Sequence, residues 1–119
     1  MITGTVTDDG IPIIILPRAG QLWQAIIDTG FNRDVELPEG LRSDAVNVQY
    51  IGRMTALLAS GQHSEEDLYA VDFPFDGRLM QAEATFVSGQ EILIGTNLLR
   101  SYRLEIHFPA RTVLLEPVA

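Results

Sequence analysis

The residues best placed to do chemistry are Asp28, Thr29 and Gly30, which directly follow the apolar run Ala25-Ile26-Ile27. A carboxylate between an apolar strand and a glycine is expected at the strand end, half withdrawn from water. Such a group can take up or donate a proton during a reaction. Asp and Gly are also favoured in ordinary turns, so the triplet alone would equally describe a simple turn.

A second motif lies far downstream, where the apolar residues 92–94 end at Gly95 and run into Thr96-Asn97-Leu98-Leu99. Segment 97–102 lacks Gly and Pro, and it places Leu98, Leu99 and Tyr102 on one face at helical spacing. The pattern predicts one short helix near the C-terminal end of the chain.

The remaining sequence is typical of strands joined by tight turns, such as Asp8-Asp9-Gly10, which favours a hairpin. Strands are predicted at 2–7, 11–16, 21–27, 45–51, 53–59, 67–75, 78–87, 104–108 and 112–116. A loop is expected at 38–40, and a polar hairpin tip is expected between 53–59 and 67–75. Because no linker, repeat or low-complexity segment is present, residues 1–119 are expected to form a single β-rich domain.

Composition and charge argue against several classes of function. The chain has no cysteine, which rules out disulfides, thiolate zinc sites and cysteine nucleophiles. Its 16 acidic and 8 basic residues give a formal net charge of −8, which disfavours binding to nucleic acid. His63 and His107 lack the partner spacing of a metal site, so no metal and no cofactor are expected. Without a signal-peptide pattern or a membrane-spanning run, a cytoplasmic location and no membrane contact are expected.

The two motifs together resemble those of the retropepsin-like aspartic proteases (clan AA), in particular the cellular branch whose active-site loop reads Asp-Thr-Gly-Phe. The match runs through Ile27 to Phe31, Leu37-Pro38, and Leu93 to Gly95 followed by Asn97-Leu98-Leu99. It covers the chain from about residue 2 to residue 116. The resemblance implies an all-β fold, a retropepsin-like half-barrel with a flap hairpin and one short C-terminal helix, active as a two-fold homodimer.

The same resemblance implies an aspartic endopeptidase that acts on peptide or protein substrates. The chain holds one Asp-Thr-Gly triplet, so each subunit of the homodimer would supply one catalytic Asp28 to a shared cleft. Closely apposed carboxylates cannot both ionise easily, and the pair shares a proton, as is established for aspartic proteases in general. Thr29 would hydrogen-bond across the two-fold axis, and Gly30, followed by Phe31, would let a substrate backbone approach closely.

The resemblance also assigns supporting residues. Ile94, Gly95 and Asn97 would lie beneath the active-site loop, where the missing Cβ of Gly95 permits close approach. The segment 53–73 falls where the family keeps its flap, and its tip, Ala59, Ser60, Gly61 and Gln62, would close over a bound peptide. Alternatively, Ile94, Gly95 and Asn97 are only core and turn residues. The segment 53–73 could likewise be an ordinary exposed hairpin.

Two features depart from the family pattern. Retroviral members pair an acidic residue two positions beyond the motif glycine with an arginine after the helix-starting glycine, and here those positions hold Asn32 and Thr96. A hydrogen bond between amide and hydroxyl would have to replace that ion pair. His107 stands where relatives often have Asp. As in relatives, the terminal strands at 2–6 and 113–118 are expected to interleave with those of a second subunit.

Two other functions are compatible with parts of the sequence. A non-catalytic dimeric module that binds peptides or partner proteins could keep the same fold, and the missing charge pair leaves room for it. A carboxylate-based glycosidase would need two distinct acids in one chain. No second acid stands in a setting comparable to that of Asp28.

Overall fold

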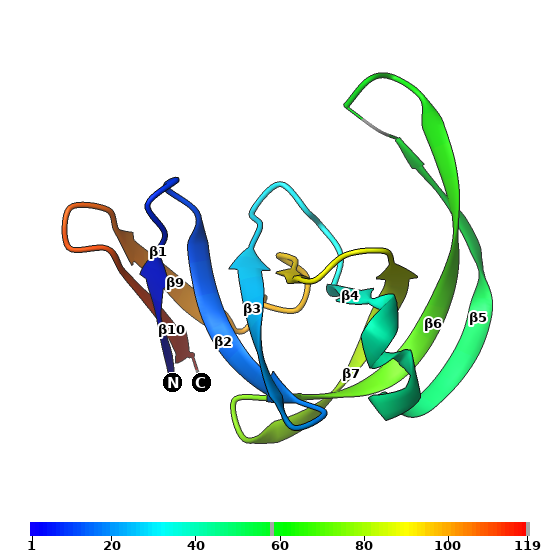
Figure 1. Ribbon diagram of the computed structural model, residues 1–119, viewed down its shortest axis with the longest axis horizontal. Helices are drawn as coiled ribbons and strands as arrows, with labels where there is room; N and C mark the ends of the chain where they lie inside the picture. Colours follow the sequence, from blue (N-terminus) through cyan, green and yellow to red (C-terminus); the bar gives the residue numbers. More distant parts are fainter. Residues whose placement is uncertain (58, 119) are drawn as a thin grey trace.

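The computed structural model describes residues 1–57 and 59–118, and its strands form one continuous sheet (Figure 1). The strands are β1 (Ile2–Val6), β2 (Pro12–Arg18), β3 (Gln21–Ile27), β4 (Val35–Pro38), β5 (Val46–Leu57), β6 (His63–Phe75), β7 (Arg78–Val87), β8 (Ile92–Ile94), β9 (Tyr102–His107) and β10 (Thr112–Pro117). Their order across the sheet is β5-β6-β7-β4-β8-β3-β2-β1-β10-β9. The all-β prediction is therefore confirmed, and within the described residues no helix is long and apolar enough to cross a membrane.

Most predicted strand boundaries lie within about two residues of the observed ones, but β4 and β8 were not predicted as strands and β6 begins at His63 rather than at residue 67. The prediction also differs at β5. Two strands were predicted at 45–51 and 53–59, but the structure has the single strand β5 between Val46 and Leu57. Its pairing with β6 shifts register twice, and Asn47 and Gly52 adopt positive φ angles of 53° and 134°. Gly52, which separated the two predicted strands, is therefore part of a bulge that bends one long strand.

The predicted helix at 97–102 is wrong. The segment consists of turns, in which the Arg100 N–H bonds to the Asn97 carbonyl at 3.4 Å and the Tyr102 N–H to the Leu99 carbonyl at 2.9 Å. The N–H of Asn97, at the start of this segment, bonds to the carbonyl of Arg33 at 3.1 Å, so the turns are held against the Asp28 loop. Leu98 and Leu99 are nevertheless buried, so the segment is anchored to the core as expected.

The helix that does form within the described residues is the 3₁₀-helix η1 (Glu39–Asp44), where a loop was predicted. Leu41 is the buried residue of η1, and Arg42 bonds to Glu39 at 2.6 Å one turn earlier. The guanidinium of Arg42 also lies 4.8 Å from the ring centre of Tyr69 and 4.5 Å from that of Phe86. One buried leucine and one stacked arginine therefore hold η1 against the sheet.

The centre of the sheet mixes parallel and antiparallel pairs and carries the core on one face. Strand β8 lies parallel to β3 and antiparallel to β4, and β4 lies parallel to β7. These pairings align Ile27, Ile94, Val35 and Ala84 in one row, and each of them is at most 3% exposed. Because side chains alternate along a strand, the next residues must point to the opposite face.

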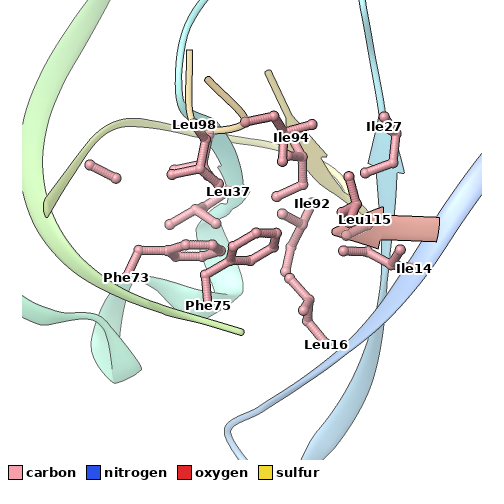
Figure 2. Packing of buried hydrophobic residues seen from close by; sticks show 14 of the residues in the cluster. Ile14, Leu16, Ile27, Leu37, Phe73, Phe75, Ile92, Ile94, Leu98 and Leu115 are labelled. Atoms are coloured by element: carbon pink, nitrogen blue, oxygen red, sulfur yellow. The ribbon is translucent and has the colours of Figure 1, made fainter. Parts of the chain in front are cut away.

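The core gathers side chains from both halves of the sheet (Figure 2). The labelled set includes Ile14 and Leu16 from β2, Phe73 and Phe75 from β6, and Leu115 from β10. Full burial of such a side chain contributes roughly 1.5–3 kcal/mol to folding. The strands β3 and β8, which lead into the two sequence motifs, are therefore fixed on a packed support.

The terminal strands pair with each other within the chain. Ile2 is the register partner of Leu115, β1 also joins β2, and β10 also joins β9 (Figure 1). The sequence had suggested that these ends interleave with a second subunit. In this arrangement β10 has neighbours on both sides, and β9 forms the outer strand of this end of the sheet.

Candidate active site

Asp28 lies directly after the last residue of β3 and is held there by backbone hydrogen bonds. Its N–H donates to the carbonyl of Ile94 on β8 at 3.0 Å, and its carbonyl accepts the N–H of Phe31 at 3.1 Å. One carboxylate oxygen, Oδ1, accepts the N–H of Gly30 at 2.9 Å. The side chain is half-buried, so the carboxylate has a fixed position and still reaches solvent.

The neighbouring loop residues differ in exposure. Thr29 and Gly30 are exposed, whereas Phe31 is half-buried with its ring directed at Gly95. A Cβ on Gly30 would lie 3.3 Å from Oδ1 of Asp28, which is a tight contact. The small residue therefore keeps the space beside the carboxylate free.

The segment after β8 lies directly against the Asp28 loop, as the sequence predicted. Gly95 donates its N–H to the carbonyl of Asp34 at 2.9 Å, and Thr96 donates to that of Phe31 at 2.8 Å. A Cβ on Gly95 would overlap the carbonyl oxygen of Arg33. Only a glycine allows the two segments to come this close.

Asp34 is a supporting residue that the sequence analysis missed. It is 8% exposed, and its carboxylate accepts the Asn97 side-chain amide at 2.6 Å and the Glu83 N–H at 2.8 Å. The predicted replacement, between Thr96 and Asn32, has an oxygen–oxygen distance of 3.5 Å, at the limit of a hydrogen bond. The strong polar link between the two motifs therefore runs from Asp34 to Asn97. Sequence reasoning could not identify Asp34, because its partners Glu83 and Asn97 lie 49 and 63 positions further along the chain.

The predicted flap tip belongs to the hairpin of β5 and β6, which rises away from the rest of the sheet (Figure 1). Ala59, Ser60, Gly61 and Gln62 are all exposed, and Gly61 has a φ of 86°, which favours glycine. Leu58 falls outside the described residues. Within the described residues no hydrogen bond joins the hairpin tip to the Asp28 loop.

A second acidic residue faces the same side of the sheet as Asp28. Glu36 on β4 is the register partner of Leu93 on β8, and Leu93 is the partner of Ile26 on β3. Asp28 follows Ile26 by two residues, so alternation directs both to one face. Burial raises the pKa of Glu36, and the nearby charges of Glu66 and Asp28 raise it further. The sequence analysis found no second acid near Asp28, because only the pairing of β4 with β8 brings Glu36 there.

Two pockets on the surface of the chain lie away from Asp28. One of about 80 Å³ is lined by Leu37, Leu41, Val71 and Phe73, with Arg18 at its edge. A second pocket is lined by residues of β5, β6 and β7, among them Asn47, Asp72 and Gln81, and Asp28 lines neither of these two pockets. Asp28 is half-buried and its neighbours Thr29 and Gly30 are exposed, so solvent can reach the carboxylate in a single chain.

His107 has a local partner. Its Nδ1 accepts the N–H of Ala110 at 3.0 Å in the turn between β9 and β10. Through this hydrogen bond, His107 stabilises the turn between β9 and β10. In the part of the chain that the structure describes, no three His, Cys, Asp or Glu side chains are grouped to hold a metal ion.

Comparison with known proteins gives matches only at the level of structure. No protein-family model and no curated protein matches the sequence. The chain is similar to a retropepsin-like aspartic protease from Rickettsia conorii, with a TM-score of 0.64 and 15% identity over 96% of this chain and 88% of that chain. It is also similar to the foamy viral protease-reverse transcriptase in complex with an RNA/DNA hybrid, with a TM-score of 0.59 and 19% identity.

In a second structure of the foamy viral enzyme, with double-stranded DNA, the TM-score is 0.57 at 19% identity. The matched region covers 80% and 79% of this chain but only 13% and 16% of the two viral chains. The likeness to the Rickettsia protein, by contrast, extends over nearly the whole of both chains. The chain therefore has the retropepsin-like fold.

Proposed function

We propose that this chain is one subunit of a homodimeric aspartic endopeptidase in which two Asp28 carboxylates activate a water molecule. The observation that carries the proposal is the setting of Asp28, half-buried at a strand end, bonded to Gly30 and reachable by solvent. The fold supports it, because one of the similar structures is described as an aspartic protease. A single Asp-Thr-Gly triplet per chain requires a second copy to complete the pair.

The reaction follows from two carboxyl groups that share one proton. The ionised Asp28 takes a proton from water, and the water oxygen bonds to the substrate carbonyl carbon. The protonated Asp28 of the second subunit gives its proton to the carbonyl oxygen, so a neutral tetrahedral diol forms. The diol then collapses: the C–N bond breaks and the amine nitrogen takes the proton of the first carboxyl group. At the same time one diol hydroxyl gives its proton to the ionised Asp28 of the second subunit, which leaves a carboxylic acid product and restores the pair.

The geometry supports this chemistry because the carboxylate is positioned before substrate arrives. The bonds to Ile94 and Gly30 fix both ends of the Asp28 residue, and the contact of Gly95 with the loop restricts its movement. A catalytic group that is already in place loses little entropy during the reaction. Thr29 is exposed and available to a second subunit, as the resemblance implies.

The dimer requires an edge, and β9 suits this role better than β5. The pairing of β5 with β6 is interrupted by two register shifts, and such bulges protect a strand edge against further pairing. Strand β9 pairs with β10 over six consecutive positions without a shift. Its outer side therefore offers a regular edge that a second copy can extend.

The proposal is tested by comparing the wild type with Asp28→Asn on a mixed peptide library between pH 4 and pH 7. We expect cleavage by the wild type alone, with both proteins folded and dimeric by sedimentation. Equal cleavage by both proteins would mean that Asp28 is not the catalytic group. Two stable dimers that both leave the library intact would instead support a peptide-binding module.

A further inference from the structure

The face of the sheet beside Asp28 combines apolar surface with a carboxylate. In register across neighbouring strands, Ile26, Leu93 and Glu36 form one row, and each is half-buried. The adjacent row on the opposite face is fully packed in the core. Asp28 directly follows β3, two residues after Ile26, so alternation places it on the same face as this row. Two aliphatic side chains therefore lie between Asp28 and Glu36.

A second carboxylate approaches from the β5–β6 hairpin. On one face of the hairpin Arg53 pairs with Glu65 at 3.3 Å and with Asp67 at 3.4 Å. Glu66 lies between these two acids in the sequence, so its side chain points to the other face. Glu66 is also close enough to Glu36 for its charge to raise the pKa of Glu36. The inner face of the hairpin thus adds a negative charge opposite β4.

Nearby basic groups are already engaged. Arg53 is occupied on the outer face of the hairpin, and Arg33 pairs with Glu83 at 3.3 Å. Within residues 1–57 and 59–118, neither Glu36 nor Glu66 takes part in an ion pair. A half-buried carboxylate without a cation costs free energy that an incoming cation would recover.

We propose that Glu36, with Glu66 opposite it, selects substrates that carry a lysine or arginine side chain next to the scissile bond. The inference rests on the proposed endopeptidase function and adds a substrate class to it. Lysine and arginine have long aliphatic stems that pack on apolar surface while the charged end reaches a polar partner. Ile26 and Leu93 suit the stem, and Glu36 suits the charged end. An acidic side chain at the same position is repelled by Glu36, Glu66 and the ionised Asp28 together.

The test uses a positional peptide library in which each position around the cleaved bond holds lysine, norleucine or glutamate in turn. We expect the wild type near pH 7 to cleave the best lysine peptide roughly ten- to a hundredfold faster, in kcat/KM, than its norleucine counterpart. Glu36→Gln should lose most of this preference and still cleave the norleucine peptide. Asp9→Asn is the matched control, because it removes one charge from an exposed turn far from this row and should keep the preference.

Each outcome separates the inference from the function on which it rests. If the wild type cleaves peptides without favouring lysine, or if Glu36→Gln keeps the full preference, the inference is overturned and the endopeptidase proposal stands. If the wild type cleaves nothing in the library, both are overturned. Glu66→Gln gives an independent measurement on the hairpin and should weaken the lysine preference partially.

Discussion

At the scale of single residues, two carboxylates a few positions apart have different environments. Asp28 is half-open with one backbone donor, whereas Asp34 is buried with two donors. Asp28 could be identified from the sequence, because it stands between an apolar strand and a glycine. Asp34 and Glu36 could not, since their roles depend on strands β7 and β8, which are distant in the sequence.

Removal of the Asp34 carboxylate should weaken the fold. Asp34→Ala would remove the acceptor of two part-buried donors, the Asn97 amide and the Glu83 N–H. Because water can partly replace the lost acceptor, we expect a loss of roughly 1–3 kcal/mol in the free energy of unfolding. Urea denaturation measures it, and Asp9→Ala in the exposed turn should change the value by less than about 0.5 kcal/mol. Equal effects of the two substitutions would contradict the role assigned to Asp34.

Glu36 predicts a pH-dependent change in stability. Burial, Glu66 and Asp28 raise the pKa of Glu36, so the folded protein holds this proton more tightly than the unfolded chain. The stability due to Glu36 is therefore complete below its ordinary pKa of about 4.5 and is lost as the pH rises through the raised value. Glu36→Gln should thus be more stable than the wild type near pH 7, and the gain should vanish near pH 4. Thermal melts across this range test it, and a gain that is independent of pH would refute the assignment.

At the scale of elements, alternation and turn residues predicted most strands, and the errors have identifiable causes. Strands β3 and β7 begin and end where the sequence placed them, and β8 coincides with the apolar run at 92–94, for which no strand was predicted. The predicted helix failed because segment 97–102 satisfies its polar groups against the Asp28 loop, as in the bond from Asn97 N–H to the Arg33 carbonyl at 3.1 Å. Such tertiary contacts are invisible to local periodicity.

The prediction at this scale concerns the close contact between Gly95, directly after β8, and the Asp28 loop. Gly95→Ala places a methyl group into the carbonyl of Arg33, so the two segments must separate. We expect a loss of about 1–3 kcal/mol or more in unfolding free energy, together with a lower cleavage rate. Gly40→Ala is the matched control, because a Cβ there meets nothing within 4 Å. If both variants were equally stable and active, the claim that this close contact requires a glycine would be wrong.

At the scale of the whole molecule, the chain is a single sheet that packs its own terminal strands and leaves β9 at one edge. The sequence motifs indicated the fold, and the proposal of a second Asp28 rests on the single Asp-Thr-Gly triplet. The sequence did not reveal that β1 and β10 pair within one chain, because strand partners depend on the complete topology. The proposed assembly therefore shifts from exchanged termini to pairing along β9.

The outer amides of β9 can report on this assembly. Val118 donates its N–H to the carbonyl of Ser101 at 2.8 Å, and alternation from that pair turns the N–H groups of Leu104 and Ile106 away from β10. In a β9-linked dimer these two amides should exchange with deuterium slowly at high protein concentration and quickly on dilution. Mass spectrometry or NMR measures the rates. A dimer by sedimentation in which both amides exchange quickly would exclude this edge.

The central claim is that one active site needs the Asp28 of two subunits, and it is tested most directly by mixing subunits. Wild type and Asp28→Asn are combined in varying ratios at constant total concentration, equilibrated by dilution and reconcentration, and assayed on the best library peptide. A shared pair predicts that activity falls with the square of the wild-type fraction, because only dimers of two wild-type subunits are active. Activity directly proportional to the wild-type fraction would show that each chain works alone and would contradict the account.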